Sequence, residues 1–196
     1  MSDPLFDTSD GNTPIDEDEA LGLKLTWVRS RGDLNEAEAA NILDARRAIR
    51  SPTLGEVLDD LWLRQLHFRM FGDVWTWAGT YRVSDRNIGI DWTEVTAAVR
   101  NLVQDAQAWI GDDEQHTSVA RFHHRLVAIH PFPNGNGRHA RAAADYLSNA
   151  LKIALPTWGA LTYNDTANLR AAYLAALRTA DRATNDLEPL VGFMWS

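Results

Sequence analysis

The sequence contains no cysteine, which excludes disulfide bonds and thiolate metal sites. No apolar run approaches the roughly 20 residues that a membrane-spanning helix needs. The acidic N-terminus also differs from a secretory signal, which begins basic and then becomes apolar. We therefore expect a cytoplasmic protein without a membrane partner.

Basic residues are absent from the first twenty positions, which carry seven aspartates and glutamates. The rest of the chain is nearly balanced, with 20 acidic and 19 basic residues, so most of the net charge of −8 lies in the N-terminal arm. A nucleic-acid-binding surface needs a basic stripe, so we expect no nucleic-acid partner. A small anionic ligand remains compatible, because it needs only a few well-placed cations.

Apolar residues recur with helical spacing, which predicts an all-α single domain over residues 34–196. An acidic arm over residues 1–33 precedes it, and a regulatory role is the expectation for this arm. Asn35 and Glu38 have the spacing of a capping box and predict a helix that ends near Ile49. A second helix is expected to begin after Ser51. Residues 74–91 depart from this helical pattern and predict a small β-hairpin flap; their sequence is VWTWAGTYRVSDRNIGID.

The segment HPFPNGNGRHAR, residues 130–141, joins two predicted helices and contains the residues most suited to chemistry. Gly135 and Gly137 flank Asn136 and allow successive backbone N–H groups to point into one concavity. That concavity opens onto a helix N-terminus, which favours an anion. Arg138 and Arg141 lie three residues apart on this helix and can reach the same phosphates. His130 stands beside them and is the one group there expected to titrate near neutral pH, so the segment predicts a polyphosphate site with a titratable histidine at its edge.

This segment resembles the Fic family signature HPFx(D/E)GNGRxxR, with Asn134 at the one specified position that differs. WAGTYR resembles the family's flap, and Arg170, Tyr173 and the later Pro189-Leu190 resemble its closing helices. The runs TPIDEDEALGL and RGDLNEAEAANI are similar to the Fic subgroup called mobile mystery protein B.

The resemblance implies a protein adenylyltransferase that moves AMP from ATP to a Ser, Thr or Tyr hydroxyl of a target protein. His130 would be the general base, and the target would dock by strand addition at the flap, residues 80–90. The remaining roles concern nucleotide binding: Gly135, Asn136 and Gly137 would hold the phosphates, and Arg138 and Arg141 would neutralise the departing pyrophosphate.

Asn134 stands where most family members place a carboxylate that holds Mg²⁺, and its amide oxygen is a weaker ligand for a hard cation. Two alternatives therefore stay open beside AMP transfer with ATP and Mg²⁺. One is a Doc-like protein kinase or another nucleotidyl transferase; the family's kinases usually carry Lys where this chain has Gly137, which favours AMP transfer. The other is a catalytically weak, toxin-like binding module held by an antitoxin.

Several other residues invite a functional interpretation beside a simpler structural one. Many Fic proteins are inhibited by a glutamate that binds the second motif arginine, and Glu17, Glu36 and Glu38 are candidates for it here. His123 is expected in the core and His139 on the surface. The tryptophans are expected to be core residues rather than a ligand platform: Trp62, Trp75, Trp77 and Trp92.

Overall fold

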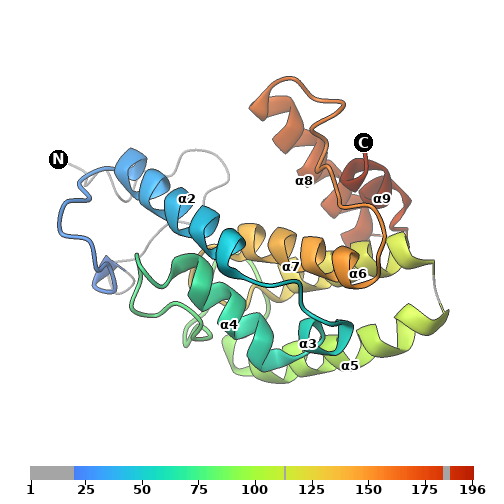
Figure 1. The fold of residues 1–196 in the computed structure, drawn as a ribbon, viewed down its shortest axis with the longest axis horizontal. Helices are drawn as coiled ribbons and strands as arrows, with labels where there is room; N and C mark the ends of the chain where they lie inside the picture. Colours follow the sequence, from blue (N-terminus) through green and yellow to red (C-terminus); the bar gives the residue numbers. More distant parts are fainter. Residues whose placement is uncertain (1–19, 113, 183–185) are drawn as a thin grey trace.

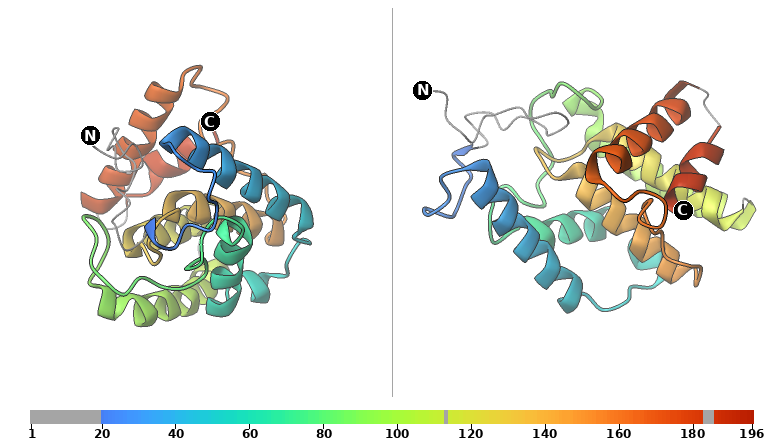
Figure 2. Two further views of the ribbon diagram at one scale, coloured as in Figure 1. Left: turned by 90° about the vertical axis from the view of Figure 1, so that its left-hand side faces the viewer. Right: turned by 90° about the horizontal axis from the view of Figure 1, so that it is seen from above.

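The computed structural model describes residues 20–112, 114–182 and 186–196, and this part of the chain is a set of packed helices (Figures 1 and 2). The helices are α2 (Arg31–Ala48), α3 (Leu54–Val57), α4 (Asp60–Phe71), α5 (Val95–Asp112), α6 (Gln115–Ile129), α7 (Asn136–Ala150), α8 (Thr166–Arg182) and α9 (Glu188–Met194). A short 3₁₀ helix, η2 (Trp92–Glu94), precedes α5. Across these described ranges, no helix has the length and apolarity needed to cross a membrane. Glu17 and most of the acidic arm lie outside them.

The capping residues correct two predicted helix starts. Helix α2 begins four residues before Asn35, because Ser30 and Asp33 form the capping box there. The predicted helix after Ser51 is two helices, because Thr53 caps α3 and Asp59 caps α4. The start of α7 at Asn136 agrees with the sequence prediction.

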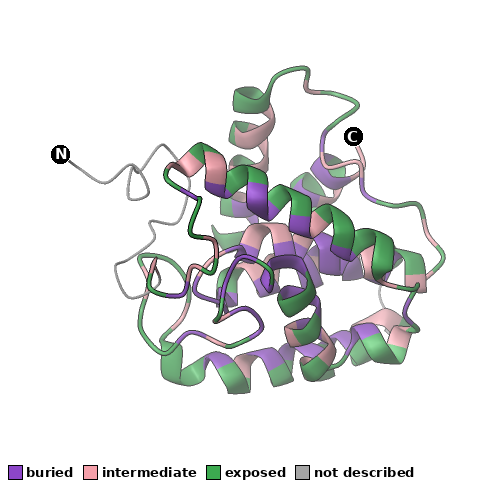
Figure 3. Cartoon of the chain, turned by 60° about the vertical axis from the view of Figure 1, so that its left-hand side comes forward, coloured by how far each residue is buried: buried purple, intermediate pink, exposed green. Residues whose placement is uncertain are grey.

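Helices α6 and α7 pack against each other at the centre of the fold, and the other helices surround them. Helix α5 covers α6, helices α3 and α4 contact α7, and α2 lies on α4. Helix α8 packs on α9, which in turn packs on α6. Figure 3 shows buried residues concentrated along the central helices, and on α7 they include Ala140, Ala142, Ala143, Ala144 and Leu147. The small side chains of the four alanines let neighbouring helices approach α7 closely.

The predicted β-hairpin is wrong: no strand forms among the described residues, and the one β-bridge there joins Leu23 to Trp75. The side chain of Arg82 gives the reason. It is 2% exposed and its guanidinium donates to the carbonyls of Ser84 and Ile90, oxygens that a cross-strand ladder could have used. The flap is therefore an irregular loop organised around a buried arginine.

Candidate functional site

The loop between α6 and α7 is held in shape by its own residues. His130 ends α6 in the left-handed conformation, with φ of 54°, and Gly135 precedes α7 with φ of 77°. A Cβ on Gly135 would lie 2.5 Å from the Phe71 ring, so glycine is required there. The Asn136 side chain accepts from the Phe132 N–H and donates to the Phe132 carbonyl, both at 2.8 Å. Asn136 therefore clamps the loop with its side chain, and only its backbone N–H is left to face a ligand.

His67 of α4 packs against the loop and holds it in place. Its ring is fully buried and stacks on Phe132 with ring centroids 3.8 Å apart. The Gly79 N–H donates to Nδ1 at 3.0 Å, so Nε2 carries the proton and donates to the Asn134 carbonyl at 3.1 Å. Burial holds the pKa of His67 well below its usual value, which keeps this ring neutral.

His130 is a buried, neutral histidine at the edge of this loop. The flap lies directly on it, since a Cβ on Gly89 would come within 2.7 Å of the His130 Cβ. Arg82 donates to the His130 carbonyl at 2.7 Å, which fixes the backbone of the residue. Both ring nitrogens are buried and have no hydrogen-bond partner in the structure. Burial, helped by the nearby Arg82 charge, lowers the pKa of His130 to about 4, so the ring is neutral at neutral pH and one of its nitrogens carries an unprotonated lone pair.

A cleft of about 720 Å³ opens above the loop, and α2 and α8 line opposite sides of it (Figure 1). On the α2 side, Glu38 is buried and its carboxylate lies 2.8 Å from the guanidinium of Arg138. The other carboxylate oxygen accepts from Trp75 Nε1 at 2.7 Å. The Arg138 side chain keeps 33% of its surface exposed and lies over the Phe71 ring, so a ligand in the cleft can reach it.

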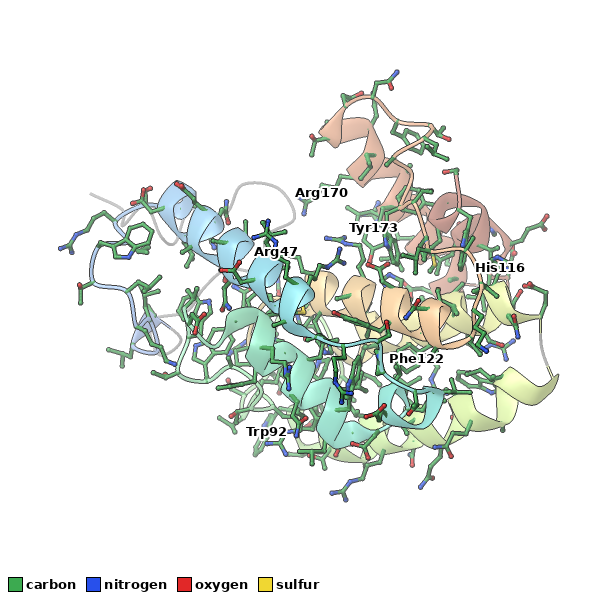
Figure 4. The ribbon with its side chains drawn as sticks, in the orientation of Figure 1. Arg47, Trp92, His116, Phe122, Arg170 and Tyr173 are labelled. Atoms are coloured by element: carbon green, nitrogen blue, oxygen red, sulfur yellow. The ribbon has the colours of Figure 1, made fainter. Side chains whose placement is uncertain are left out.

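On the α8 side, Arg141 is held by an aromatic residue instead of a carboxylate. Its guanidinium carbon lies 5.7 Å from the centroid of the Tyr173 ring. Tyr173 in turn meets the buried His123 of α6, with 2.9 Å between the hydroxyl and Nε2. Figure 4 shows Tyr173 and Arg170 on the side of α8 that faces α2 and α7.

The cleft is suited to a polyanion. Four arginines line it, and of these four only Arg138 forms an ion pair with a carboxylate of the described residues. Arg31 contributes two buried guanidinium nitrogens, Nε and Nη2, that have no hydrogen-bond partner. The first N–H groups of α7 also face no intrahelical acceptor. The remaining arginines of the cleft are Arg141 and Arg170.

The described residues do not supply a protein cage for Mg²⁺. They contain no cluster of three or more His, Cys, Asp or Glu side chains that could hold a metal ion. The side-chain oxygen of Asn134 already accepts from the Gly135 N–H at 2.6 Å. Glu38, the one carboxylate residue among the described residues that line the cleft, is engaged by Arg138 and Trp75.

The structure brings the residues of the predicted site together around this cleft: His130, Asn134, Gly135, Asn136, Gly137, Arg138 and Arg141. His123 is buried as expected, but the surface prediction for His139 is wrong: it is fully buried, and its Nε2 lies 2.9 Å from the Leu63 carbonyl. Trp75 is a core residue, whereas Trp92 is 41% exposed.

Three residues that the sequence analysis did not assign to the site support it: His67, Arg82 and Tyr173. The sequence contains a signal for His67, because this residue shares the apolar face of α4 with Leu63 and Met70.

Comparison with known proteins agrees with this geometry. Residues 57–148 match the model of the Fic/DOC family. No curated protein sequence matches the chain significantly.

Three solved structures illustrate the shared fold. The N-terminal Fic domain of a cell filamentation protein from Bartonella quintana, solved with bound ADP, has 18% identity and a TM-score of 0.68, over 86% of each chain. BepC from Bartonella tribocorum, solved with bound AMPPNP, has 15% identity and a TM-score of 0.64, over 85% of this chain and 87% of that one. Fic-1 from C. elegans has 21% identity and a TM-score of 0.60, over 87% of this chain and 50% of that one.

Proposed function

We propose that this protein is a protein adenylyltransferase that transfers AMP from ATP to a hydroxyl group of a target protein. The observation that carries the proposal is the environment of His130. A buried neutral imidazole stands at the edge of a cleft whose described lining includes a helix N-terminus and three arginines, Arg31, Arg141 and Arg170, that form no ion pair with a described carboxylate. Structures of the same fold with ADP and with AMPPNP support the choice of an adenine nucleotide.

In the proposed reaction, a ring nitrogen of His130 takes the proton of the target hydroxyl. The hydroxyl oxygen forms a bond to the α-phosphorus of ATP, the bond from that phosphorus to the bridging oxygen breaks, and pyrophosphate leaves. The N–H groups of Gly137 and its neighbours, with Arg138 and Arg141, would stabilise the negative charge on the phosphates. A bound polyanion would also raise the pKa of His130 from its low value toward the working pH.

Mg²⁺ would enter with the nucleotide, held by its phosphates and by water, and would add positive charge at the leaving group. The described residues offer no cluster of three or more His, Cys, Asp or Glu side chains for it, and the Asn134 oxygen already accepts one hydrogen bond from its own loop.

Glu38 is the inhibitory residue that we propose for this enzyme. Its carboxylate neutralises Arg138, a residue expected to bind phosphate, and so competes with the nucleotide. The contacted arginine is the first of the motif rather than the second. Glu36 is exposed on the same helix and is not among the residues that line the cleft. An antitoxin, as a separate protein, would inhibit the enzyme in addition to Glu38.

The target protein would dock on the flap, residues 80–90, by backbone pairing. Val83 and Ile88 are exposed apolar side chains there, at 74% and 50%, and Ile88 lines the cleft together with His130. Val83→Pro removes a backbone donor and should abolish labelling of the target while ATP binding persists, as calorimetry would measure. Loss of both together would mean that this segment is structural.

Incubation with α-labelled and γ-labelled ATP in a cell lysate tests the proposed function. Transfer of the α-label alone indicates AMP transfer. Transfer of the γ-label alone indicates a kinase, and no transfer despite ATP binding indicates a binding module. Mass spectrometry of the labelled band would then identify the modified residue.

A further inference from the structure

Tyr173 is a side-chain connection between α8 and the two central helices. Helix α8 itself packs on α9, and α9 packs on α6. From α8, the Tyr173 hydroxyl reaches His123 of α6 at 2.9 Å, and the ring of Tyr173 lies against Arg141 of α7. One residue of α8 therefore contacts both a motif arginine and a buried histidine behind it.

The chemistry of these groups fixes the direction of their interactions. A guanidinium donates hydrogen bonds and cannot accept them, so the Tyr173 oxygen is the acceptor for Arg141. Burial raises the pKa of Tyr173 to about 12, and the charge and hydrogen bond of Arg141 offset part of this shift. The hydroxyl proton of Tyr173 is then free to point at His123, and in the arrangement that we infer Nε2 of His123 accepts it. The proton of His123 consequently resides on Nδ1. Nδ1 is buried and forms no hydrogen bond of normal geometry among the described residues, although the nearby Ala140 carbonyl acts to raise the pKa of this ring.

His123 stays neutral in this position. Burial lowers its pKa to about 3, so it remains an acceptor for Tyr173 throughout the neutral pH range.

The partner of Arg141 preserves its charge. The nearest acidic residue on α7 is Asp145, but its carboxylate binds Arg46 and Trp158 Nε1, at 2.5 Å and 2.9 Å. A carboxylate bound directly to Arg141 would neutralise it, as Glu38 does with Arg138. A tyrosine hydroxyl instead orients the guanidinium and leaves its full charge for a ligand.

We propose that Tyr173 and His123 are positioning residues that orient Arg141 toward the terminal phosphates of the bound nucleotide. This inference rests on the proposed function for the identity of the ligand. It also makes the position of α8 a condition for tight nucleotide binding, because Tyr173 reaches Arg141 only while α8 keeps this position. Neither residue contacts the reacting atoms; both act through the arginine.

Calorimetric titration of Tyr173→Phe with ATP and with AMP tests the proposal. This change keeps the ring beside Arg141 and removes only the hydroxyl. We expect ATP to bind about tenfold more weakly, since a hydrogen bond to a charged group is lost, and AMP to bind within about twofold of wild type. Tyr163→Phe is the matched control, because Tyr163 belongs to the same aromatic cluster through Phe193 and does not line the cleft, and it should leave both affinities unchanged. Equal loss of ATP and AMP affinity, or no loss of either, would overturn the proposal.

A second pair of variants tests the role of His123. His123→Gln keeps an acceptor for the Tyr173 hydroxyl and should retain ATP affinity, whereas His123→Leu should lose about as much as Tyr173→Phe. Combining His123→Leu with Tyr173→Phe should add little further loss, because both changes break the same chain. Independent, additive losses would contradict it.

Nitrogen NMR of the His123 ring in wild type provides a readout that needs neither ligand nor a destabilised variant. We expect the neutral Nδ1–H tautomer from pH 6 to 8, and an Nε2–H ring would overturn the proposed chain. The two proposals also fail in different ways. ATP binding without transfer would reject the adenylyltransferase and leave the Tyr173 comparison valid. Normal transfer with unchanged ATP affinity in Tyr173→Phe would reject the positioning role alone.

Discussion

On the α2 side of the cleft, Arg138 meets the carboxylate of Glu38 at 2.8 Å, and on the α8 side, Arg141 meets Tyr173. The two arginines lie one helical turn apart on α7 and differ in what their partners do to their charge. Glu38 fixes the position of Arg138 and neutralises it, whereas Tyr173 fixes Arg141 and leaves it positive. Arg138 must therefore be released from Glu38 before it can bind phosphate, whereas Arg141 can bind phosphate as it stands.

In the proposed reaction, the arginines on both sides hold the nucleotide while His130 takes the proton, so removing His130 should have the largest effect on the rate of AMP transfer. His130→Ala should lower the rate of AMP transfer by roughly 10²–10⁴-fold, the usual range for a positioned acid–base group. ATP affinity should change little, because both arginines keep their partners. Label transfer from α-labelled ATP and calorimetry measure the two quantities. Near-full labelling by a folded His130→Ala variant would contradict the assignment of the base.

Acid should weaken the α8 side through His123, whose pKa is about 3 in the folded protein and about 6.5 in an unfolded chain. Between these values the unfolded chain binds a proton that the folded protein does not, so stability falls as pH decreases below 6.5. Each such proton contributes about 1.4 kcal/mol per pH unit to the slope.

Urea unfolding of wild type and His123→Gln from pH 7 to pH 4.5 measures this contribution. The variant should show a shallower decrease by about one proton. Parallel curves would mean that His123 does not titrate in this way.

A smaller effect is expected at Asn134, between the two sides. Asn134→Asp keeps the oxygen that accepts from the Gly135 N–H and adds a charge that attracts Mg²⁺. We expect the Mg²⁺ concentration for half-maximal labelling to fall by about two- to fivefold. Binding of metal-free ATP should not improve, since the new carboxylate repels phosphate. Superimposable Mg²⁺ titrations would show that position 134 does not face the metal.

The sequence was informative where local chemistry decides the structure. Pro131, Gly135 and the helix that begins at Asn136 follow from backbone preferences, so the loop and its arginines were predictable. The family resemblance added His130 as base, which remains a proposal.

Contacts between distant segments were not predictable in the same way. The pairing of Glu38 with Arg138 joins residues 100 positions apart, and Tyr173 meets His123 across 50. His139 was misplaced because the neighbour that buries it, α4, cannot be inferred from the α7 pattern alone. The flap misled for a related reason: TYRV has the composition of a strand, but the Arg82 side chain takes carbonyls that strand pairing would use.

The most direct test of the difference between the two sides is the ATP affinity of Glu38→Gln. Glutamine can still accept from Trp75 Nε1 but no longer neutralises Arg138. We predict at least about fivefold tighter ATP binding, the lower end of a typical coupling between sites. The gain should be absent from Glu38→Gln combined with Arg138→Gln, and Glu36→Gln, an exposed change on the same helix, should bind as wild type. Unchanged or weaker ATP binding by a folded Glu38→Gln variant would contradict the account, as would a gain that persists without Arg138.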